Sequence, residues 1–455
     1  MNSIEERPEN NCTDGKVGKA RQSAPFFTFW FGETTSLFGS QITLLALPLT
    51  AVLLFHADAL QLGLLNTAIS APFLLITLFA GVWINHHRRR PLLIGANIGR
   101  ALLLGLIPLF ALAGWLRIEY LYIIAFLAGC LTVFFYLAFQ AFLPTLVARE
   151  KLVNANSKLS ASQSIAEIGG PGLAGLLIQL VTAPIAIVVD ALSFCIAAGS
   201  LLLIHVPESL PDPTERQGNF LSEIRKGFQL MFRNRYLRAF AGEAATYNLF
   251  WQMILTVFLL YAVRVLGFSS GLLGLIFATG SGGALLGSLL TGFIARRIGP
   301  GSTIIVAAAL GDIPLLVLPL VTRTTPGGVV ILMLALFIQG VGIAGCNVHV
   351  DSIRQAIIPE SLRGCANASY RLLVSGALPL GALLGGFLGN AFGLQTTLLL
   401  GACGLLSTWF WVVFSPVRTL RAFPLGEASS SLLEAKGLTV TASPNEKEGV
   451  SGSKK

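Results

Sequence analysis

The chain alternates between long apolar runs and short polar loops. Each run is long enough to cross about 30 Å of hydrocarbon as a helix that rises about 1.5 Å per residue. Strands of a membrane barrel would instead alternate apolar and polar residues over about ten positions. We therefore expect an all-α membrane protein with twelve transmembrane helices, at roughly 26–54, 60–84, 92–114, 119–142, 159–181, 184–204, 240–262, 270–294, 302–321, 328–350, 370–392 and 395–414.

Similar segments recur at one spacing along the chain. The loop that begins at Gly81 (Gly-Val-Trp-Ile-Asn-His-His-Arg-Arg-Arg) returns in weaker form at Gly292, 211 residues later. The same offset relates Gly170 to Gly381 and Ala155 to Ala366. Three matches at one offset predict two six-helix pseudo-repeats. The expected organisation is a cytoplasmic tail (1–25), a first bundle (26–205), a central linker with an amphipathic helix (206–239), a second bundle (240–415) and a disordered cytoplasmic tail (416–455).

Composition agrees with a membrane protein. Of 455 residues, 54% are hydrophobic and only 12% are charged, against about 25% charged in soluble proteins. The net charge of +9 does not indicate nucleic-acid binding, because the basic residues lie in short loops between apolar runs. Cysteines and histidines are scattered without metal-ligand spacing, and no phosphate-cradling Gly-Lys-Ser/Thr loop is present. We expect no metal site, no cofactor, no catalytic residues and no ATP-driven pumping.

The position of the basic residues predicts the orientation. Of the 31 Lys and Arg residues, 27 fall in the two tails or in loops on one side of the predicted bundle, and three fall on the other side. The positive-inside rule then places both termini in the cytoplasm, and an even number of spans agrees with this because it puts both termini on the same side. In the central linker, apolar positions in 220–232 have the spacing of an amphipathic helix on the inner leaflet, with Arg225 and Lys226 near anionic headgroups. A solvated tether is the alternative.

Twelve spans in two repeats, with a Gly-x-x-x-polar-basic-x-x-basic-basic loop after the second span, resemble the major facilitator superfamily. The chain is more narrowly similar to its bacterial macrolide-efflux and enterobactin-exporter-like branch. That narrower resemblance is carried by segments 32–48, 148–156, 189–194, 223–237 and 358–371. It implies a secondary transporter that works by alternating access, with its binding site near the bilayer midplane between the halves. It does not identify the substrate, because this fold hosts many solutes.

The repeated loop departs from the family pattern. The family's usual acid falls at Asn85 and its following arginine at His86, while Arg88 replaces a glycine. Asn85 can accept a hydrogen bond but carries no charge, so we expect a less firmly latched inward-closed state. The basic residues could instead be simple positive-inside anchors. The candidate gating residues are Gly81, Asn85, Arg88, Arg89, Arg90, Gly292, Arg296 and Arg297.

The fifth predicted helix carries a second motif. Gly170, Pro171 and Gly175 resemble the Gly-Pro motif in the fifth helix of antiporters and exporters. Small residues let a helix approach its partner closely, and Pro171 removes a backbone donor and permits a kink. Such a smooth face suits a rocking interface between halves, although ordinary small-residue packing is the alternative.

Polar residues form stripes on the first, fourth, seventh and tenth predicted helices, which the family fold places around a central cavity. The cavity-lining candidates are Ser36, Ser40, Thr43, Thr132, Tyr136, Gln140, Tyr247, Gln252, Gln339 and Asn347. A charge at a helix centre costs about 2.5–3.5 kcal/mol on insertion scales, so each acid within a span needs a reason. A carboxyl group in a low-dielectric cavity favours its neutral form and can load and release a proton. The proton-coupling candidates are Glu33, Glu243, Asp190, Glu167 and Asp312, with Glu33 leading.

Asp190 and Asp312 lie on helices that the fold places outside the cavity, which favours structural pairing for them. Arg100, inside the third span, needs an acid or carbonyl partner, and a structural ion pair is the default interpretation. Together these features predict an exporter of an amphipathic organic compound (a drug, macrolide or siderophore-like molecule) in the bacterial inner membrane. We expect it to be driven by the proton gradient and to act as a monomer in the lipid bilayer. An importer or uniporter of a small metabolite is the alternative. A membrane enzyme would need clustered catalytic residues and a sensor would need a soluble domain, and the sequence shows neither.

Overall fold

The computed structural model describes residues 14–84, 87–148, 151–205, 220–359 and 362–420, and these ranges are helical without a strand. They contain eleven helical segments that are long and apolar enough to cross a membrane. The prediction of an all-α membrane protein is therefore confirmed.

The helices of the first part of the chain are α1 (Asp14–Leu54), α2 (Ala59–Leu75), α3 (Thr77–Ile84), α4 (Arg89–Leu112), α5 (Ile118–Leu146), α6 (Leu152–Val181) and α7 (Ala183–Leu203). Those of the second part are α8 (Phe220–Arg233), α9 (Arg235–Arg264), α10 (Ser270–Ile298), α11 (Pro300–Asp312), η2 (Ile313–Leu320), α12 (Pro326–Ile357), α13 (Arg363–Phe392), α14 (Leu394–Leu405), α15 (Thr408–Val413) and η4 (Pro416–Thr419).

The second predicted run, 60–84, is occupied by α2 and α3, which are separated at Ile76. Pro72 within α2 has no N–H to donate, and the Thr77 hydroxyl donates to the Phe73 carbonyl at 2.5 Å. In a regular helix the Phe73 carbonyl would accept a hydrogen bond only from a backbone N–H. A side-chain hydroxyl that competes for the same carbonyl often bends the helix. Neither piece alone has the length of a span, so the count of twelve stays a prediction.

Helices extend beyond several of the predicted runs. α1 begins at Asp14, inside the segment predicted as a tail, and α9 begins at Arg235 rather than near 240. Hydropathy marks the part of a helix that crosses hydrocarbon, but residues such as Lys, Arg, Ala and Gln continue a helix into water at little cost. Asn234 sets the start of α9, because its side chain accepts hydrogen bonds from the backbone N–H groups of Tyr236 and Leu237.

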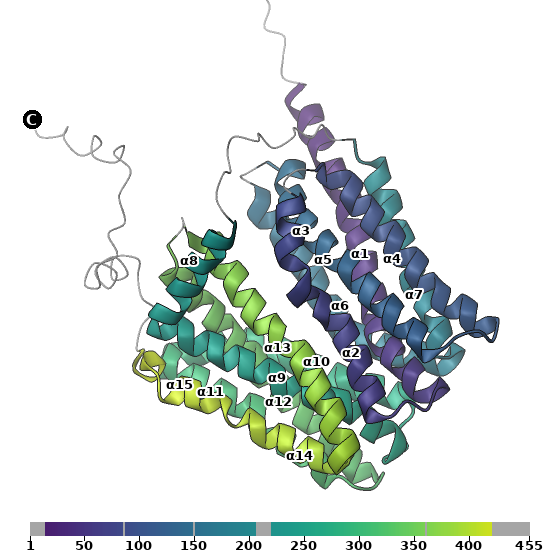
Figure 1. Cartoon of the computed structure of the whole chain (residues 1–455). Helices are drawn as coiled ribbons and strands as arrows, with labels where there is room; N and C mark the ends of the chain where they lie inside the picture. Colours follow the sequence, from purple (N-terminus) through teal and green to yellow (C-terminus); the bar gives the residue numbers. More distant parts are fainter. Residues whose placement is uncertain (1–13, 85–86, 149–150, 206–219, 360–361, 421–455) are drawn as a thin grey trace, which may run out of the picture.

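The helices form two bundles, α1–α7 and α9–α15 (Figure 1). Within the first bundle, α1 packs against α6 and α7, and α4 packs between α5 and α7. Within the second bundle, α10 and α11 pack against α12, while α9 packs against α13 and α14. The bundles are joined mainly by α2 with α13 and by α6 with α10, and α9 also contacts α1 and α2.

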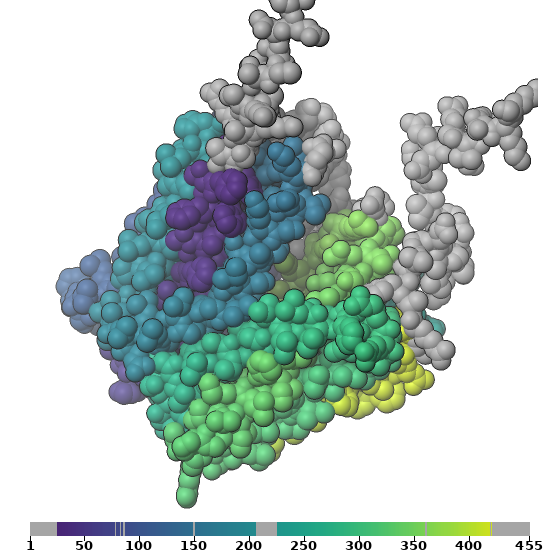
Figure 2. Space-filling model, turned by 180° about the vertical axis from the view of Figure 1, so that it is seen from behind, coloured from purple at the N-terminus to yellow at the C-terminus, as the bar shows by residue number. Residues whose placement is uncertain are grey.

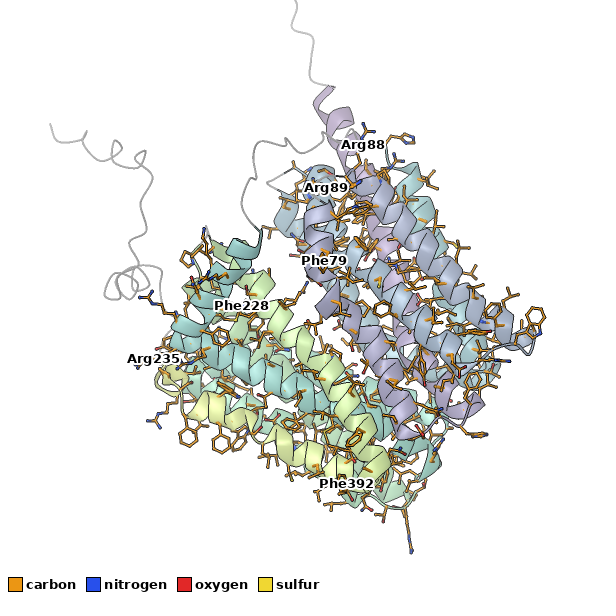
Figure 3. The ribbon with its side chains drawn as sticks, in the orientation of Figure 1. Phe79, Arg88, Arg89, Phe228, Arg235 and Phe392 are labelled. Atoms are coloured by element: carbon orange, nitrogen blue, oxygen red, sulfur yellow. The ribbon has the colours of Figure 1, made fainter. Side chains whose placement is uncertain are left out.

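The bundles share an apolar core at one end only. We call the end that carries α8 and the end of α3 the α8 end, and the opposite end, where Figure 3 labels Phe392, the far end. At the far end a single apolar core contains residues of both bundles, among them Leu62 and Phe258. At the α8 end each bundle has its own core, and the space-filling view shows the surface hollowed between them (Figure 2). The structure is therefore open between the bundles at the α8 end.

Small residues allow the close approach at the far end. A Cβ atom built on Gly63 of α2 would lie 2.7 Å from the Ala382 carbonyl oxygen and 2.8 Å from the Gly386 Cα of α13. Likewise, a Cβ on Gly175 of α6 would lie 2.7 Å from the Gly274 Cα of α10. Backbones approach this closely only where side chains are absent. Gly175 of the fifth-helix motif and Gly386 of its repeat thus lie at the two seams between the bundles. Gly170 instead packs on Gln41 of α1 and Gly381 on Leu249 of α9, each inside its own bundle.

The helix α8 covers the start of α13. Gly227 lies against Cys365 and Ser369 of α13, and Met231 is only 3% exposed, while Arg225 and Lys226 are exposed. An amphipathic helix on the inner leaflet was predicted here. Part of the face that was expected to contact lipid packs against α13 instead. The tail beyond residue 420 and the linker residues 206–219 lie outside the described residues.

Candidate functional site

Arg100 is a cation buried inside the first bundle. Arg100 of α4 is 5% exposed, and its guanidinium lies 4.3 Å from the ring centroid of Phe135 and 4.1 Å from that of Phe194. It also donates a hydrogen bond to Asn97 Oδ1 at 2.5 Å. Two aromatic faces and one amide oxygen thus hold a cation that would be costly to bury alone.

Two acids lie near this cation. Asp190 of α7 is 1% exposed, accepts a hydrogen bond from Ser193 at 3.2 Å, and lies beside Ser40 and Thr43 of α1. Glu33 of α1 is half-buried, and Arg100 interacts electrostatically with both carboxylates. Neither acid comes within the 4.0 Å N–O distance of an ion pair with a described residue. The expected ion pair of Arg100 is therefore absent in this conformation; aromatic faces and an amide oxygen take its place.

Helix spacing alone could not have shown this grouping. Ser40 and Thr43 were predicted to line the cavity between the bundles, but they lie beside Asp190 inside the first bundle. Ser36 on the same stripe is buried. Their role in lining the cavity stays a prediction. Arg100 is the member whose importance the sequence indicated least, because its partners are on three other helices.

The second bundle has buried acids at related positions. Glu243 of α9 is 8% exposed, with Cys346 Sγ at 4.0 Å from its Oε1. Asp312 at the end of α11 is 1% exposed, accepts a hydrogen bond from Thr408 Oγ1 at 2.6 Å, and interacts electrostatically with Glu243. Gly311-Asp312 follows Gly99-Arg100 by 212 residues, close to the repeat spacing. At the repeat spacing of 211 residues Arg100 corresponds to Gly311, so the second bundle has an acid one residue away from the position that carries the cation in the first.

Polar candidates nearer the seam form pairs. Gln339 of α12 donates to the Tyr247 hydroxyl of α9 at 2.8 Å, and both are buried. Gln140 donates to the hydroxyl of Tyr136 on α5, and the Arg371 guanidinium of α13 lies 4.3 Å from the Tyr136 ring centroid. This last contact joins the two bundles.

The remaining polar candidates are dispersed. Glu167 is exposed and accepts a hydrogen bond from Gln163 at 2.9 Å. The Thr132 hydroxyl donates to the Ala128 carbonyl of its own helix. Gln252 is half-buried and Asn347 is exposed. Among the described residues, no three His, Cys, Asp or Glu side chains gather as metal ligands would.

The repeated basic loops lie at the α8 end, where Figure 3 labels Arg88 and Arg89. Arg90 donates to the Leu201 and Leu202 carbonyls at 3.0 and 2.9 Å, so it caps the end of α7 in its own bundle. In the second bundle, the Arg297 guanidinium lies 4.5 Å from the Phe293 ring centroid. Gly81 and Gly292 lie within α3 and α10, Arg296 is exposed, and Asn85 lies outside the described residues. The gating role of these loops stays a prediction.

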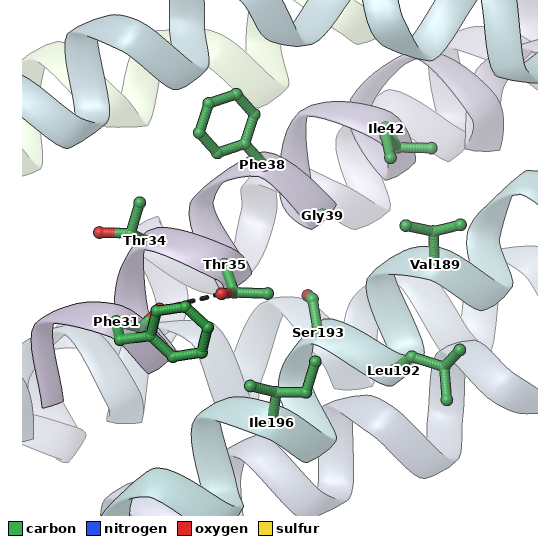
Figure 4. Close-up of a pocket in the computed structure, with 10 residues that line it drawn as sticks. All are labelled: Phe31, Thr34, Thr35, Phe38, Gly39, Ile42, Val189, Leu192, Ser193 and Ile196. Atoms are coloured by element: carbon green, nitrogen blue, oxygen red, sulfur yellow. Dashed lines mark hydrogen bonds between the residues drawn. The ribbon is translucent and has the colours of Figure 1, made fainter. Parts of the chain in front are cut away.

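A groove of about 500 Å³ lies between α1 and α7 (Figure 4). Its rim is formed by exposed apolar side chains such as Phe31 and Leu192, which are 63% and 57% exposed. Ser193, which bonds to Asp190, lies between the two helices at this groove (Figure 4). The groove is apolar and belongs to the first bundle, not to the space between the bundles.

Two helical bundles that are joined by glycine seams and contain buried charges define a multi-pass membrane protein of the transporter class. The sequence profile of the Major Facilitator Superfamily matches residues 29–373 and 249–444, so the chain belongs to this superfamily. This confirms the predicted resemblance.

Known relatives carry efflux names at low identity. Macrolide efflux protein A of Streptococcus pyogenes is 23% identical over 406 residues, which are 88% of this chain and 97% of that protein. The multidrug efflux pump Tap of Mycolicibacterium fortuitum is 26% identical over 400 residues, 86% of this chain and 96% of that protein. These relatives are bacterial, in agreement with a bacterial inner-membrane protein.

Solved structures share the fold. The nucleoside transporter NupG has a TM-score of 0.69 at 12% identity and covers 86% of this chain and 98% of its own. A bacterial homologue of the iron transporter ferroportin in its inward-facing state has a TM-score of 0.65 at 17% identity, with the same coverage.

Proposed function

We propose that the chain exports an amphipathic organic compound by proton-coupled alternating access. The observation that carries this proposal is the charge centre of Glu33, Arg100 and Asp190 within the first bundle, in a chain whose bundles share a core at one end only. Buried ionisable groups in membrane spans are costly and are retained mainly for function. A half-buried Glu33 beside a fixed cation suits the loading and release of a proton.

The conformation supports alternating access. The shared core at the far end and the separate cores at the α8 end are what one of two alternating states requires. The basic loops and α8 mark the α8 end, which the positive-inside rule assigns to the cytoplasm. In this proposal the structure is the inward-open form.

The substrate class follows from the residues near the seam. They offer the aromatic ring of Tyr136 with the Arg371 guanidinium beside it, and a few amide and hydroxyl groups. Such a lining suits an amphipathic molecule better than a sugar, which needs many more polar partners. The efflux names of the relatives point the same way.

The test measures export from cells that overproduce the protein, with a panel of macrolides, fluorescent dyes and catecholate siderophores. We expect export that a protonophore abolishes and that Glu33→Gln reduces at unchanged membrane level. Glu119→Gln, at an exposed acid at the start of α5, is the matched control and should export normally.

Export that survives the protonophore would overturn proton coupling. Proton-dependent export that is intact in Glu33→Gln would move the coupling role to Glu243, Asp190, Glu167 or Asp312. Net uptake instead of export would favour the alternative, an importer or uniporter of a small metabolite.

A further inference from the structure

The charge centre of the first bundle holds hydrogen-bond donors that are not satisfied. Arg100 Nε and Asn97 Nδ2 have no hydrogen-bond partner in the described part of the chain, although Arg100 is 5% and Asn97 0% exposed. Buried donors in proteins are nearly always paired. These two donors can therefore each bind an additional acceptor oxygen.

The two acids near Arg100 differ in how firmly they are held. Asp190 is fully buried, bonded to Ser193 and enclosed by α1, where Gly39 leaves space for it. One turn along α7, Phe194 stacks on the guanidinium, so Asp190 lies on the same face of the helix. Glu33 is half-buried and forms no hydrogen bond with a described residue. Of the two carboxylates, only that of Glu33 is free to move.

We propose that Arg100 is a positioning residue that receives the Glu33 carboxylate when Glu33 loses its proton, while Asp190 stays as its fixed counter-ion. With Glu33 protonated, the charges of Arg100 and Asp190 cancel, and the present conformation has this separated arrangement. With Glu33 ionised, the centre carries one net negative charge, and direct pairing with the vacant Nε–H compensates the cost of burying it. The centre thus exchanges one proton, and the pairing of Glu33 with Arg100 reports whether the proton is bound.

Other charged groups near these helices face elsewhere. On α6, Glu167 is exposed and bonded to Gln163, and the Lys158 ammonium lies 4.6 Å from the Phe27 ring centroid. On α5, Glu119 is exposed in the first turn at the far end. On α4, Arg90 is bound to carbonyls at the end of α7. Arg100 is therefore the cation that sets the protonation of Glu33.

This inference rests on the proposed proton coupling, but its test needs no substrate. Infrared difference spectra of the purified full chain in lipid would be recorded across pH, and the band of a protonated carboxyl group assigned by its loss in Glu33→Gln. In Arg100→Gln we expect this band to persist to a pH about one unit higher or more, because one pH unit corresponds to about 1.4 kcal/mol of lost interaction. Arg100→Lys, which keeps the charge, should restore most of the wild-type titration.

A second variant separates positioning from folding. Arg100→Gln alone leaves two buried acids without a cation and can fail to fold, whereas Arg100→Gln with Asp190→Asn removes one charge of each sign. We expect the double variant to recover membrane level but to keep the displaced Glu33 titration. A wild-type titration in Arg100→Gln or in the double variant would overturn the inference. If the displacement is found but export is independent of protons, the proposed function fails and the inference about Arg100 stands.

Discussion

At the scale of residues, two of the buried charged groups in the described part of the chain are held by specific neighbours. Arg100 is held by two phenyl rings and an amide oxygen, and Asp312 by the hydroxyl of Thr408. Removing one such buried partner destabilises a protein by more than the average net contribution of a hydrogen bond, because it leaves a desolvated polar group unpaired. The effect of removing it can therefore be predicted.

Thr408→Val removes the hydroxyl that donates to Asp312 and keeps the shape of the side chain. We expect it to lower the free energy of unfolding by about 1–3 kcal/mol, because a fully buried carboxyl group loses its donor. Thr408→Ser, which retains the hydroxyl, should lose clearly less. Unfolding of the purified protein in mixed detergent micelles, followed by circular dichroism, measures both. Equal stability of the valine variant and the wild type would show that another group satisfies Asp312.

The sequence predicts which residues are costly to bury but not which residues meet. Glu33, Asp190, Glu243 and Asp312 stand out because they are acids in apolar runs. Arg100 was expected to pair with an acid, yet besides Asn97 of its own helix it is held by the rings of Phe135 and Phe194, which look like ordinary apolar positions in the sequence. Their contact depends on how α5 and α7 pack on α4, and no local spacing encodes that.

At the scale of elements, hydropathy predicted the helices well and their interruptions poorly. The run 60–84 is continuous in hydropathy, yet it is broken at Ile76, where Pro72 and the hydroxyl of Thr77 disturb the ladder. The start of α1 at Asp14 was missed because helix formation outside hydrocarbon depends on propensity, not on hydropathy. The glycine repeats were visible in the sequence, and the structure places Gly175 where α6 meets α10 and Gly386 where α2 meets α13.

A single methyl group tests whether close helix approach is needed. Gly63→Ala adds a Cβ that would lie 2.7 Å from a backbone oxygen of α13, which cannot be avoided by a side-chain rotation. We expect the seam to widen at the far end and export to fall several-fold or more. Gly105→Ala on α4, where a Cβ meets nothing within 4 Å, is the control; it should be neutral or stabilising by up to about 1 kcal/mol through helix propensity. Normal export by both variants would show that the seam tolerates a wider separation.

At the scale of the whole molecule, the far end must open if the bundles alternate. This end is closed by polar contacts as well as by the shared core. Asn66 Nδ2 of α2 donates to Thr256 Oγ1 of α9 at 3.0 Å, and the Arg264 guanidinium of α9 donates to the Ala57 carbonyl at 2.8 Å. Both contacts join one bundle to the other, so they cannot persist in a state that is open at the far end.

Cysteines at positions 66 and 256 should therefore lock the transporter. In a background without the six native cysteines, Asn66→Cys with Thr256→Cys should form a cross-link on oxidation, because their side chains are in contact across the seam. We expect the cross-linked protein to lose export and reduction to restore it, while each single cysteine exports at its usual rate under oxidation. A thiol label placed at the α8 end should remain reactive in the locked protein, because that end is open in this conformation. Export by fully cross-linked protein would mean that transport does not require the far end to open, and alternating access of these two bundles would have to be abandoned.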